Sequence, residues 1–220
     1  MSKPVCTIVG AGPGISLAVA ERFAREGFQI ALIARRAAAL DEYVRQLGGS
    51  ATAHGFVADA GDEQALIGAF DAIHQLGPTA VLVYNASAGH AGSPLTLAAA
   101  DLIADFKVSV VGALVATQQV VPHMQASGRG TILLTGGGLA LNPYPAYAAL
   151  AVGKAGIRNL SFSLAAELAP ARIHVATITI DGFVQPNTPL APDVIAEGYW
   201  RLHTQPRNQW EREIVYRAAA

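Results

Sequence analysis

Two side chains in the second half of the sequence have the chemistry for acid–base catalysis: the phenol of Tyr147 and the ammonium of Lys154. They are seven residues apart, and at about 3.6 residues per turn seven positions return to within ~20° of one helical face. A phenol there can stabilise or protonate an oxyanion, and a neighbouring ammonium can withdraw charge from it. A packing role is the alternative for Tyr147, whereas a charge in so apolar a stretch as that around Lys154 needs a partner.

A glycine cluster near the start of the chain indicates a second kind of site. Gly10, Gly12 and Gly14 directly follow the apolar run 5–9 and precede a helical pattern that ends at residue 26. Small residues let a phosphate approach the backbone, and a helix N-terminus presents unpaired N–H groups. The pattern favours a dinucleotide-binding loop over a simple strand-to-helix turn.

Two arginines follow the second apolar run, and they bear on the choice of cofactor. Arg35 and Arg36 stand at its end, and no carboxylate occurs before Asp41. A ribose without a 2′-phosphate usually meets an acidic residue at this point, whereas a phosphorylated ribose calls for arginine. We therefore expect NADP(H) rather than NAD(H). Two solvated arginines are the alternative, although cations are unfavourable at a helix N-terminus unless an anion is nearby.

These residues belong to a regular alternation of strand and helix patterns. Strands are predicted at 5–9, 29–34, 51–58, 79–84, 131–135 and 173–180, and helices after the glycines to 26 and at 37–47, 62–76, 97–124 and 146–168. The runs 80–83 and 132–134 are continuously apolar, as expected for strands covered on both faces. The alternation predicts an α/β fold, a doubly wound parallel sheet of Rossmann type with helices on both faces.

The predicted domain organisation is a single unit, residues 1–220, that ends in a short substrate loop and C-terminal segment, 186–220. Residues 199–216 suggest a final helix followed by an edge strand. The proline-rich stretch 186–192 follows a strand end where ligands bind in such sheets, so we expect either a mobile flap or an ordinary connector there.

Composition excludes several classes of function. The chain has 15 basic and 16 acidic residues, so no basic excess favours nucleic acid as a partner. Hydrophobic residues make up 52% and charged residues 14%, against roughly 25% charged in typical domains, which excludes disorder. Long uncharged stretches are interrupted by Gly, Pro, Asn, Gln or His, which indicates buried elements rather than membrane spans.

Cysteine and histidine usage point to a cytoplasmic protein without a metal. Cys6 is the only cysteine, so no intramolecular disulfide can form, and the apolar run at 5–9 is too short for a signal peptide. The six histidines are scattered without ligand spacing, so no metal site is expected.

The order of these pieces resembles the short-chain dehydrogenase/reductase superfamily over about residues 4–184. The resemblance implies that the cofactor is held by two groups of residues. The first group, Gly10, Gly12, Gly14 and Ile15, meets the dinucleotide; in the second, Asp59 contacts adenine, Asn85 follows the fourth strand, and Val184 lies in the segment 181–184 beside the nicotinamide.

The catalytic half of the usual family pattern is altered. That pattern is Tyr-x-x-x-Lys, with a serine thirteen residues before the tyrosine and an asparagine on the fourth helix. With Lys154 as the lysine, the other three positions hold Leu150, Gly137 and Ser109. The glycines 136–138 then either widen the pocket or leave backbone N–H groups free to bind an oxyanion.

Two departures resemble one divergent branch, the enoyl-acyl-carrier reductases. Tyr147 and Lys154 have its Tyr-x6-Lys spacing, and residues 10–18 fit its Gly-x5-Ser-x-Ala loop, which adds Ser16 to the cofactor site. The resemblance implies an NADP(H)-dependent reductase of an enoyl C=C or a carbonyl, with Tyr147 as acid and Lys154 as ribose anchor. A cofactor-binding sensor or subunit without turnover is the alternative. The usual alcohol dehydrogenase is disfavoured because Leu150 cannot donate a proton.

The resemblance also implies a homo-oligomer, a dimer or tetramer, and the apolar face of 108–121 is compatible with either a subunit contact or burial under the sheet. Substrates on an acyl carrier need basic residues near the pocket mouth, for which Arg201 and Arg207 are the candidates.

Overall fold

Seven parallel strands form one sheet, in the order β3-β2-β1-β4-β5-β6-β7, in the computed structural model, which describes residues 3–217. The strands are β1 (Val5–Val9), β2 (Gln29–Ala34), β3 (Ala53–Val57), β4 (Thr79–Tyr84), β5 (Gly130–Thr135), β6 (Ile173–Asp181) and β7 (Glu213–Arg217). The chain begins at β1 in the middle of the sheet, winds outward to β3, and then crosses back to β4. A crossover of this kind creates a crevice at the carboxyl ends of β1 and β4, where open α/β sheets bind ligands.

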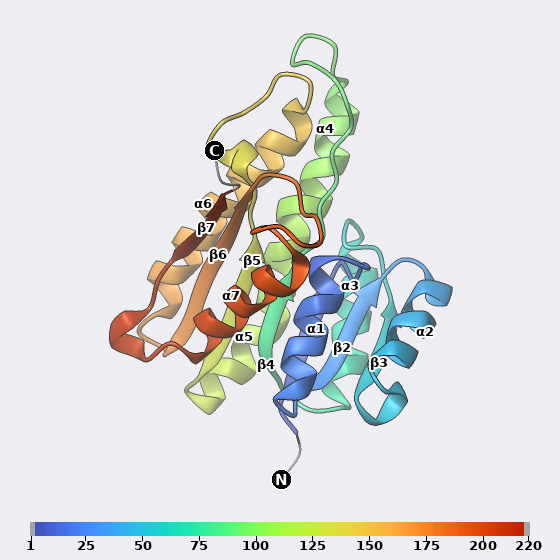
Figure 1. Ribbon diagram of the computed structural model, residues 1–220, viewed down its shortest axis with the longest axis vertical. Helices are drawn as coiled ribbons and strands as arrows, with labels where there is room; N and C mark the ends of the chain where they lie inside the picture. The colour runs from blue at the N-terminus through green and yellow to red at the C-terminus, as the bar shows by residue number, and fades with distance from the viewer. Residues whose placement is uncertain (1–2, 218–220) are drawn as a thin grey trace.

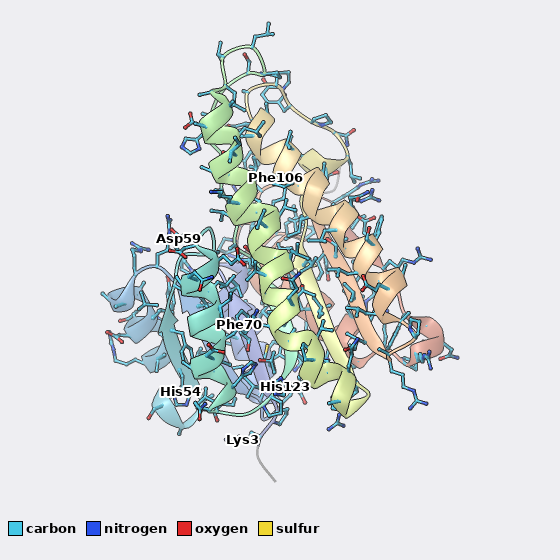
Figure 2. The ribbon with its side chains drawn as sticks, turned by 180° about the vertical axis from the view of Figure 1, so that it is seen from behind. Lys3, His54, Asp59, Phe70, Phe106 and His123 are labelled. Carbon is cyan, nitrogen blue, oxygen red and sulfur yellow. The ribbon has the colours of Figure 1, made fainter. Side chains whose placement is uncertain are left out.

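Helices cover both faces of the sheet, which confirms the predicted single-domain, doubly wound fold (Figure 1). One face carries α1 (Ile15–Arg25), α2 (Ala37–Gln46) and α7 (Pro192–Thr204); the other, seen in Figure 2, carries α3 (Glu63–His74), α4 (Ala99–Phe106), α5 (Gly112–Ser127) and α6 (Ala148–Leu168). Each face has its own apolar core. Strands β1, β4 and β5 are buried almost throughout, which explains their predominantly apolar sequence.

The predicted helix 97–124 is interrupted in the structure. After α4, residues Lys107–Val111 form a turn of π-helix, and α5 then continues to Ser127. The hydroxyl of Tyr84 donates a hydrogen bond to the carbonyl of Val108, and such a partner favours a π-turn because the wider turn leaves carbonyls outside the α-helical ladder. Gly128 ends α5 with a φ of 63°, as is usual for a glycine after a helix.

Other boundaries differ by a few residues. Strand β3 begins at Ala53 because Gly49–Ala51 form a 3-10 turn. At the C-terminal end, α7 and the edge strand β7 confirm the predicted helix and strand. In the proline-rich stretch, Leu190 is buried and its N–H donates to the hydroxyl of Thr188, so this part is better described as a connector than as a flap.

The loops that follow β1, β2, β3, β4, β5 and β6 meet at one end of the sheet, beyond which α4 projects at the top of Figure 1. This arrangement brings residues far apart in the sequence into one region. Within residues 3–217, no helix is long and apolar enough to cross a membrane.

Candidate active site

The glycine loop after β1 lies directly against the loop after β4. Gly10 has a φ of 84°, and a Cβ at this position would lie 2.4 Å from the backbone nitrogen of Ala86, so only glycine fits. Asn85 Nδ2 donates to Ser16 Oγ at 2.7 Å, and Ser16 Oγ donates to the carbonyl of Gly10 at 2.9 Å. These hydrogen bonds join three residues that the sequence assigned separately to a cofactor site.

The other two glycines of this loop have free space around them. A Cβ at Gly12 or Gly14 would meet no heavy atom within 4 Å. Gly14 is the N-cap of α1 and provides no side-chain cap, so the N–H groups of Ile15 and Ser16 are available to an anion, whereas that of Leu17 donates to the carbonyl of Gly12.

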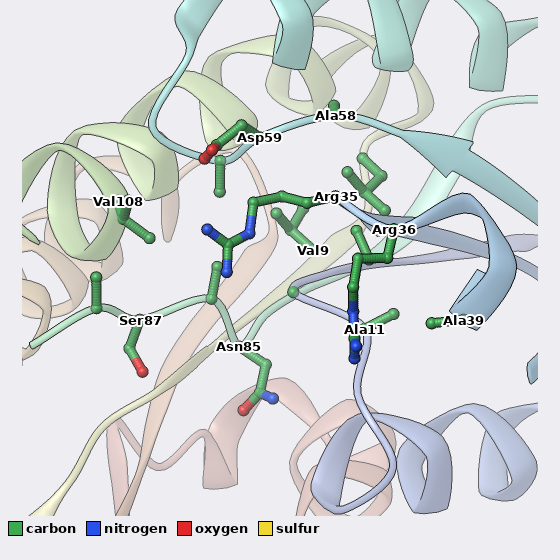
Figure 3. Close-up of a pocket in the computed structure, with 16 residues that line it drawn as sticks. Val9, Ala11, Arg35, Arg36, Ala39, Ala58, Asp59, Asn85, Ser87 and Val108 are labelled. Atoms are coloured by element: carbon green, nitrogen blue, oxygen red, sulfur yellow. The ribbon is translucent and has the colours of Figure 1, made fainter.

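A pocket of about 280 Å³ lies at the ends of β2 and β3. Figure 3 shows Arg35 and Arg36 extending into it, Arg35 toward the side where Asp59 lies and Arg36 toward Ala11 of the glycine loop. Asp59 Oδ1 accepts a hydrogen bond from the N–H of Gly61 at 2.9 Å. Among the ion pairs of the described residues none involves Arg35 or Arg36, so both guanidinium groups are available to a bound anion.

A larger cavity, about 740 Å³, opens at the ends of β4, β5 and β6 beside the first turns of α6. It is lined by both candidate catalytic residues, Tyr147 and Lys154, and by three predicted cofactor contacts, Ile15, Asn85 and Val184. Tyr147 is the N-cap of α6 and is 51% exposed, which places its ring at the cavity mouth. Its centroid lies 6.1 Å from that of the Tyr144 ring.

Lys154 lies deeper in the same cavity. Its Nζ donates to the carbonyl of Thr135 at 3.0 Å, and among residues 3–217 no carboxylate forms an ion pair with it. Burial lowers the pKa of Lys154 to about 8 because the charged form loses hydration without a compensating anion. The ammonium is thus a partly buried cation with unused donor capacity.

The glycines 136–138 after β5 were expected either to widen the pocket or to leave backbone N–H groups free for an oxyanion. The structure shows no widening at Gly137. A Cβ at Gly137 would lie 3.3 Å from Cγ, Cδ and Cε of Lys154, so the lysine stem occupies this space. Binding of an oxyanion by the backbone of these glycines is also restricted, because the N–H of Gly136 already donates to the carbonyl of Ile178. At Gly138 a Cβ would overlap the carboxylate of Asp181, which lies against the loop.

Ser109 does not line the cavity. It is buried in the π-turn, where its Oγ accepts from the N–H of Ala88 at 3.2 Å and lies 3.4 Å from the carbonyl of the same residue. The side chain at this position therefore supports the loop after β4. Leu150 does line the cavity, as an apolar wall between Tyr147 and Lys154.

A second support for this loop was not predicted from the sequence. Asp105 on α4 is 1% exposed; it accepts the N–H of His90 at 2.6 Å and lies 2.8 Å from His90 Nδ1. Further along, Gly92 pairs with Tyr147 in a parallel bridge and donates to the carbonyl of Ala146. The loop thus links α4 to the start of α6. His90 and Asp105 are 15 residues apart, and no spacing rule connects them.

The prediction that Arg201 and Arg207 lie near the pocket mouth is wrong. Arg201 pairs with Glu211, and Arg207 donates to the carbonyl of Ala169, just before β6 begins. Both lie at the amino ends of the strands, opposite the cavity. His54 and His123 also lie at that end, away from Asp59 (Figure 2). Across the described part of the chain, no three His, Cys, Asp or Glu side chains gather in a way that would hold a metal.

Comparison with known proteins agrees with this geometry. The chain is 33% identical over 175 residues to the probable galactose dehydrogenase GalD of Rhizobium meliloti, covering 78% of this chain and 68% of that protein. The crystal structure of a metagenomic short-chain oxidoreductase in complex with NADP superposes with a TM-score of 0.89 at 27% identity, covering 100% of this chain and 99% of the other. NAD+-bound xylitol dehydrogenase gives 0.77 at 30% identity, covering 84% and 72%. The profile described as short chain dehydrogenase matches residues 4–193, and the protein belongs to that family of oxidoreductases.

Proposed function

We propose that the protein is an NADP(H)-dependent reductase of an enoyl C=C or a carbonyl group in a small molecule, with Tyr147 as the acid and Lys154 as the ribose anchor. The observation that carries the proposal is that a phenol and a partly buried ammonium, which has no acidic partner in the described part of the chain, line one cavity. The direct test is oxidation of NADPH by the purified chain with a panel of enones and ketones.

Three features of the chain fit the cofactor. The close approach at Gly10 and the open N-terminus of α1 leave room for a pyrophosphate, the arginines after β2 have no acidic partner among the described residues, and Lys154 has donor capacity for ribose hydroxyls. When bound, the cofactor supplies the hydride. The residues that would hold it are Gly10, Gly12, Gly14, Ile15, Ser16, Arg35, Arg36, Asp59, Asn85, Lys154 and Val184.

Proton transfer and charge stabilisation would come from the two catalytic candidates, Tyr147 and Lys154. The Tyr147 hydroxyl would donate its proton to the substrate oxygen, which becomes negative as an enolate or an alkoxide. The positive charge of Lys154 would lower the cost of negative charge on the substrate oxygen and on the tyrosine that has lost its proton. Leu150 offers an apolar contact and no proton, so in this proposal Tyr147 is the donor.

Replacement of Arg35 tests the choice of cofactor. In the proposed site its guanidinium meets the 2′-phosphate, a charge that NADH lacks, so we expect Arg35→Ala to weaken NADPH binding by about tenfold or more and NADH binding by less than about twofold. Titration of protein fluorescence with each cofactor measures both constants. Arg45, which pairs with Glu42 on α2, provides the control variant Arg45→Ala. Equal losses for the two cofactors would refute the assignment.

We also propose that the chain forms a homo-oligomer, a dimer or tetramer, through α4 and α5. Phe106, Val111 and Leu114 are each more than a third exposed along these helices. Burial of such side chains against a second copy would remove apolar surface from water. Light scattering should give a multiple of the monomer mass, and Leu114→Glu should lower it; a monomeric wild-type chain would contradict the proposal.

The alternative is a cofactor-binding protein without turnover. It is favoured by Ser109, whose hydroxyl is bonded to Ala88 instead of facing the cavity, and by the absence of a side chain at Gly137. In that case NADPH raises the melting temperature, but no enone or ketone in the panel is reduced.

A further inference from the structure

The cavity beside Lys154 has mainly apolar walls. Leu139, Leu150, Ile180 and Phe183 contribute to its lining, in addition to Ile15 and Val184, which the proposed function assigns to the cofactor. Phe183 is 87% exposed, so an aromatic side chain stands at the rim of the cavity. An apolar ligand gains from burial against such walls, whereas a polar one loses hydration.

Three polar side chains within the cavity already hydrogen-bond to other groups of the protein, and the proposed function assigns the remaining donors of Lys154 to the cofactor ribose. The hydroxyl of Thr135 lies 2.6 Å from that of Tyr199, Asn85 donates to Ser16, and Lys154 donates to the carbonyl of Thr135. The remaining polar groups, on Ser87, Asn142, Tyr144 and Tyr147, belong to exposed residues at the mouth. The deep part of the cavity therefore offers a ligand few hydrogen-bond partners.

The charges around the cavity disfavour a second anion. Lys154 is the only cation that lines it among the described residues, and the proposed function assigns this ammonium to the cofactor ribose. Asp181 also lines the cavity; its Oδ2 lies 3.5 Å from Nε of Arg217, a largely exposed pair that is screened by water. A carboxylate or phosphate entering the cavity would lose its hydration without gaining a free cation.

We propose that the cavity accepts uncharged, predominantly apolar carbonyl or enoyl compounds and excludes polyols, sugars and anions. This inference rests on the proposed function for the reaction, but it concerns which ligands the walls accept. It separates this chain from two of the proteins that it is similar to, whose names refer to galactose and xylitol. A polyol would bury several hydroxyls with no partner, and each would weaken binding by about tenfold.

The test measures ligand binding to the full chain saturated with tetrahydro-NADP, an analogue whose ring is uncharged, as in NADPH, and which cannot reduce a ketone. Calorimetry compares the methyl ester of 6-acetyl-2-naphthoic acid with the free acid, which has the same ketone and skeleton, and with xylitol. We expect the ester to bind about 30-fold more tightly than the acid, and xylitol not to bind at millimolar concentration. Three results would overturn the inference: an affinity of the acid within threefold of that of the ester, an affinity of xylitol higher than that of the ester, or no binding of any probe.

A matched pair of variants tests the apolar wall itself. Leu139→Gln places an amide in the lining and is expected to weaken ester binding by about fivefold to tenfold. Leu95→Gln makes the same change at a side chain that is 97% exposed and does not line the cavity, and is expected to leave the affinity unchanged. Equal affinities in the two variants would contradict the assignment. Turnover is scored separately: if ligand ranking holds but NADPH is never oxidised, the inference stands and the proposed reaction fails.

Discussion

The Tyr147→Phe variant is expected to lose about 100-fold to 1000-fold in kcat for reduction of an enone or ketone by NADPH, the range typical of a missing general acid. The ring and its position at the N-terminus of α6 are retained, so only the hydroxyl is removed. The affinity for NADPH should stay within about twofold, because the cofactor is held by other residues. Steady-state kinetics and a cofactor titration measure the two effects.

Tyr144 provides the matched comparison for this experiment. Its ring also lines the cavity, 6.1 Å from that of Tyr147, and it is similarly exposed. We expect Tyr144→Phe to lower kcat by less than about threefold, because the proposed proton donor is Tyr147, the N-cap of α6, and Tyr144 lies three residues further from this helix along the chain. If Tyr144→Phe removes activity and Tyr147→Phe does not, the proton donor has been assigned to the wrong tyrosine.

The Lys154→Met variant is expected to be more stable than the wild-type chain without cofactor, with a melting temperature about 5 °C higher at pH 7. Burial lowers the pKa of Lys154 from 10.5 to about 8, which corresponds to a cost of about 3 kcal/mol for the charged form in the folded state. Loss of the hydrogen bond to Thr135 removes about 1 kcal/mol of stabilisation, which leaves a net gain of about 2 kcal/mol. The same variant should no longer be stabilised by NADPH.

The pH dependence has a definite sign. Between pH 8 and 10.5 the unfolded chain retains the Lys154 proton and the folded chain releases it, so this group makes the free energy of unfolding rise with pH. The gain in free energy of unfolding from Lys154→Met is therefore largest below pH 8 and disappears toward pH 10.5. Thermal unfolding followed by circular dichroism at pH 7 and 9.5 measures it, with the exposed Lys107→Met as control. A melting temperature at pH 7 that is lower for Lys154→Met than for the wild-type chain would show that the charge of Lys154 does not destabilise the fold.

The sheet was predictable because its strands are buried on both faces. The limits of β1, β2 and β4 follow from predominantly apolar runs that are followed by glycine, arginine or asparagine. The convergence of the glycine loop with Asn85 follows from the parallel arrangement itself. Placement of Arg201 and Arg207 at the mouth was wrong because a helix after β6 must run back toward the amino ends of the strands.

Other features depend on contacts that no local pattern contains. The π-turn at Lys107–Val111 is accompanied by a hydrogen bond from Tyr84, 24 residues earlier. The packing of the Lys154 stem on Gly137 depends on how α6 crosses the end of β5, and the His90–Asp105 contact depends on the path of a loop. Spacing along one helix predicted that Tyr147 and Lys154 share a face, but the exposure of the tyrosine ring at the mouth was visible only in the structure.

The loop after β4 contacts both the glycine loop and Tyr147. Asp105 and Ser109 hold it on the helical side, Ala86 rests on Gly10, and Gly92 bridges to Tyr147. A tilt of α4 would therefore be transmitted to the glycine loop and to Tyr147 at the same time. In the proposed site this would couple cofactor affinity to catalytic rate, and a substitution in α4 that shifts this helix is expected to alter both together rather than either one alone.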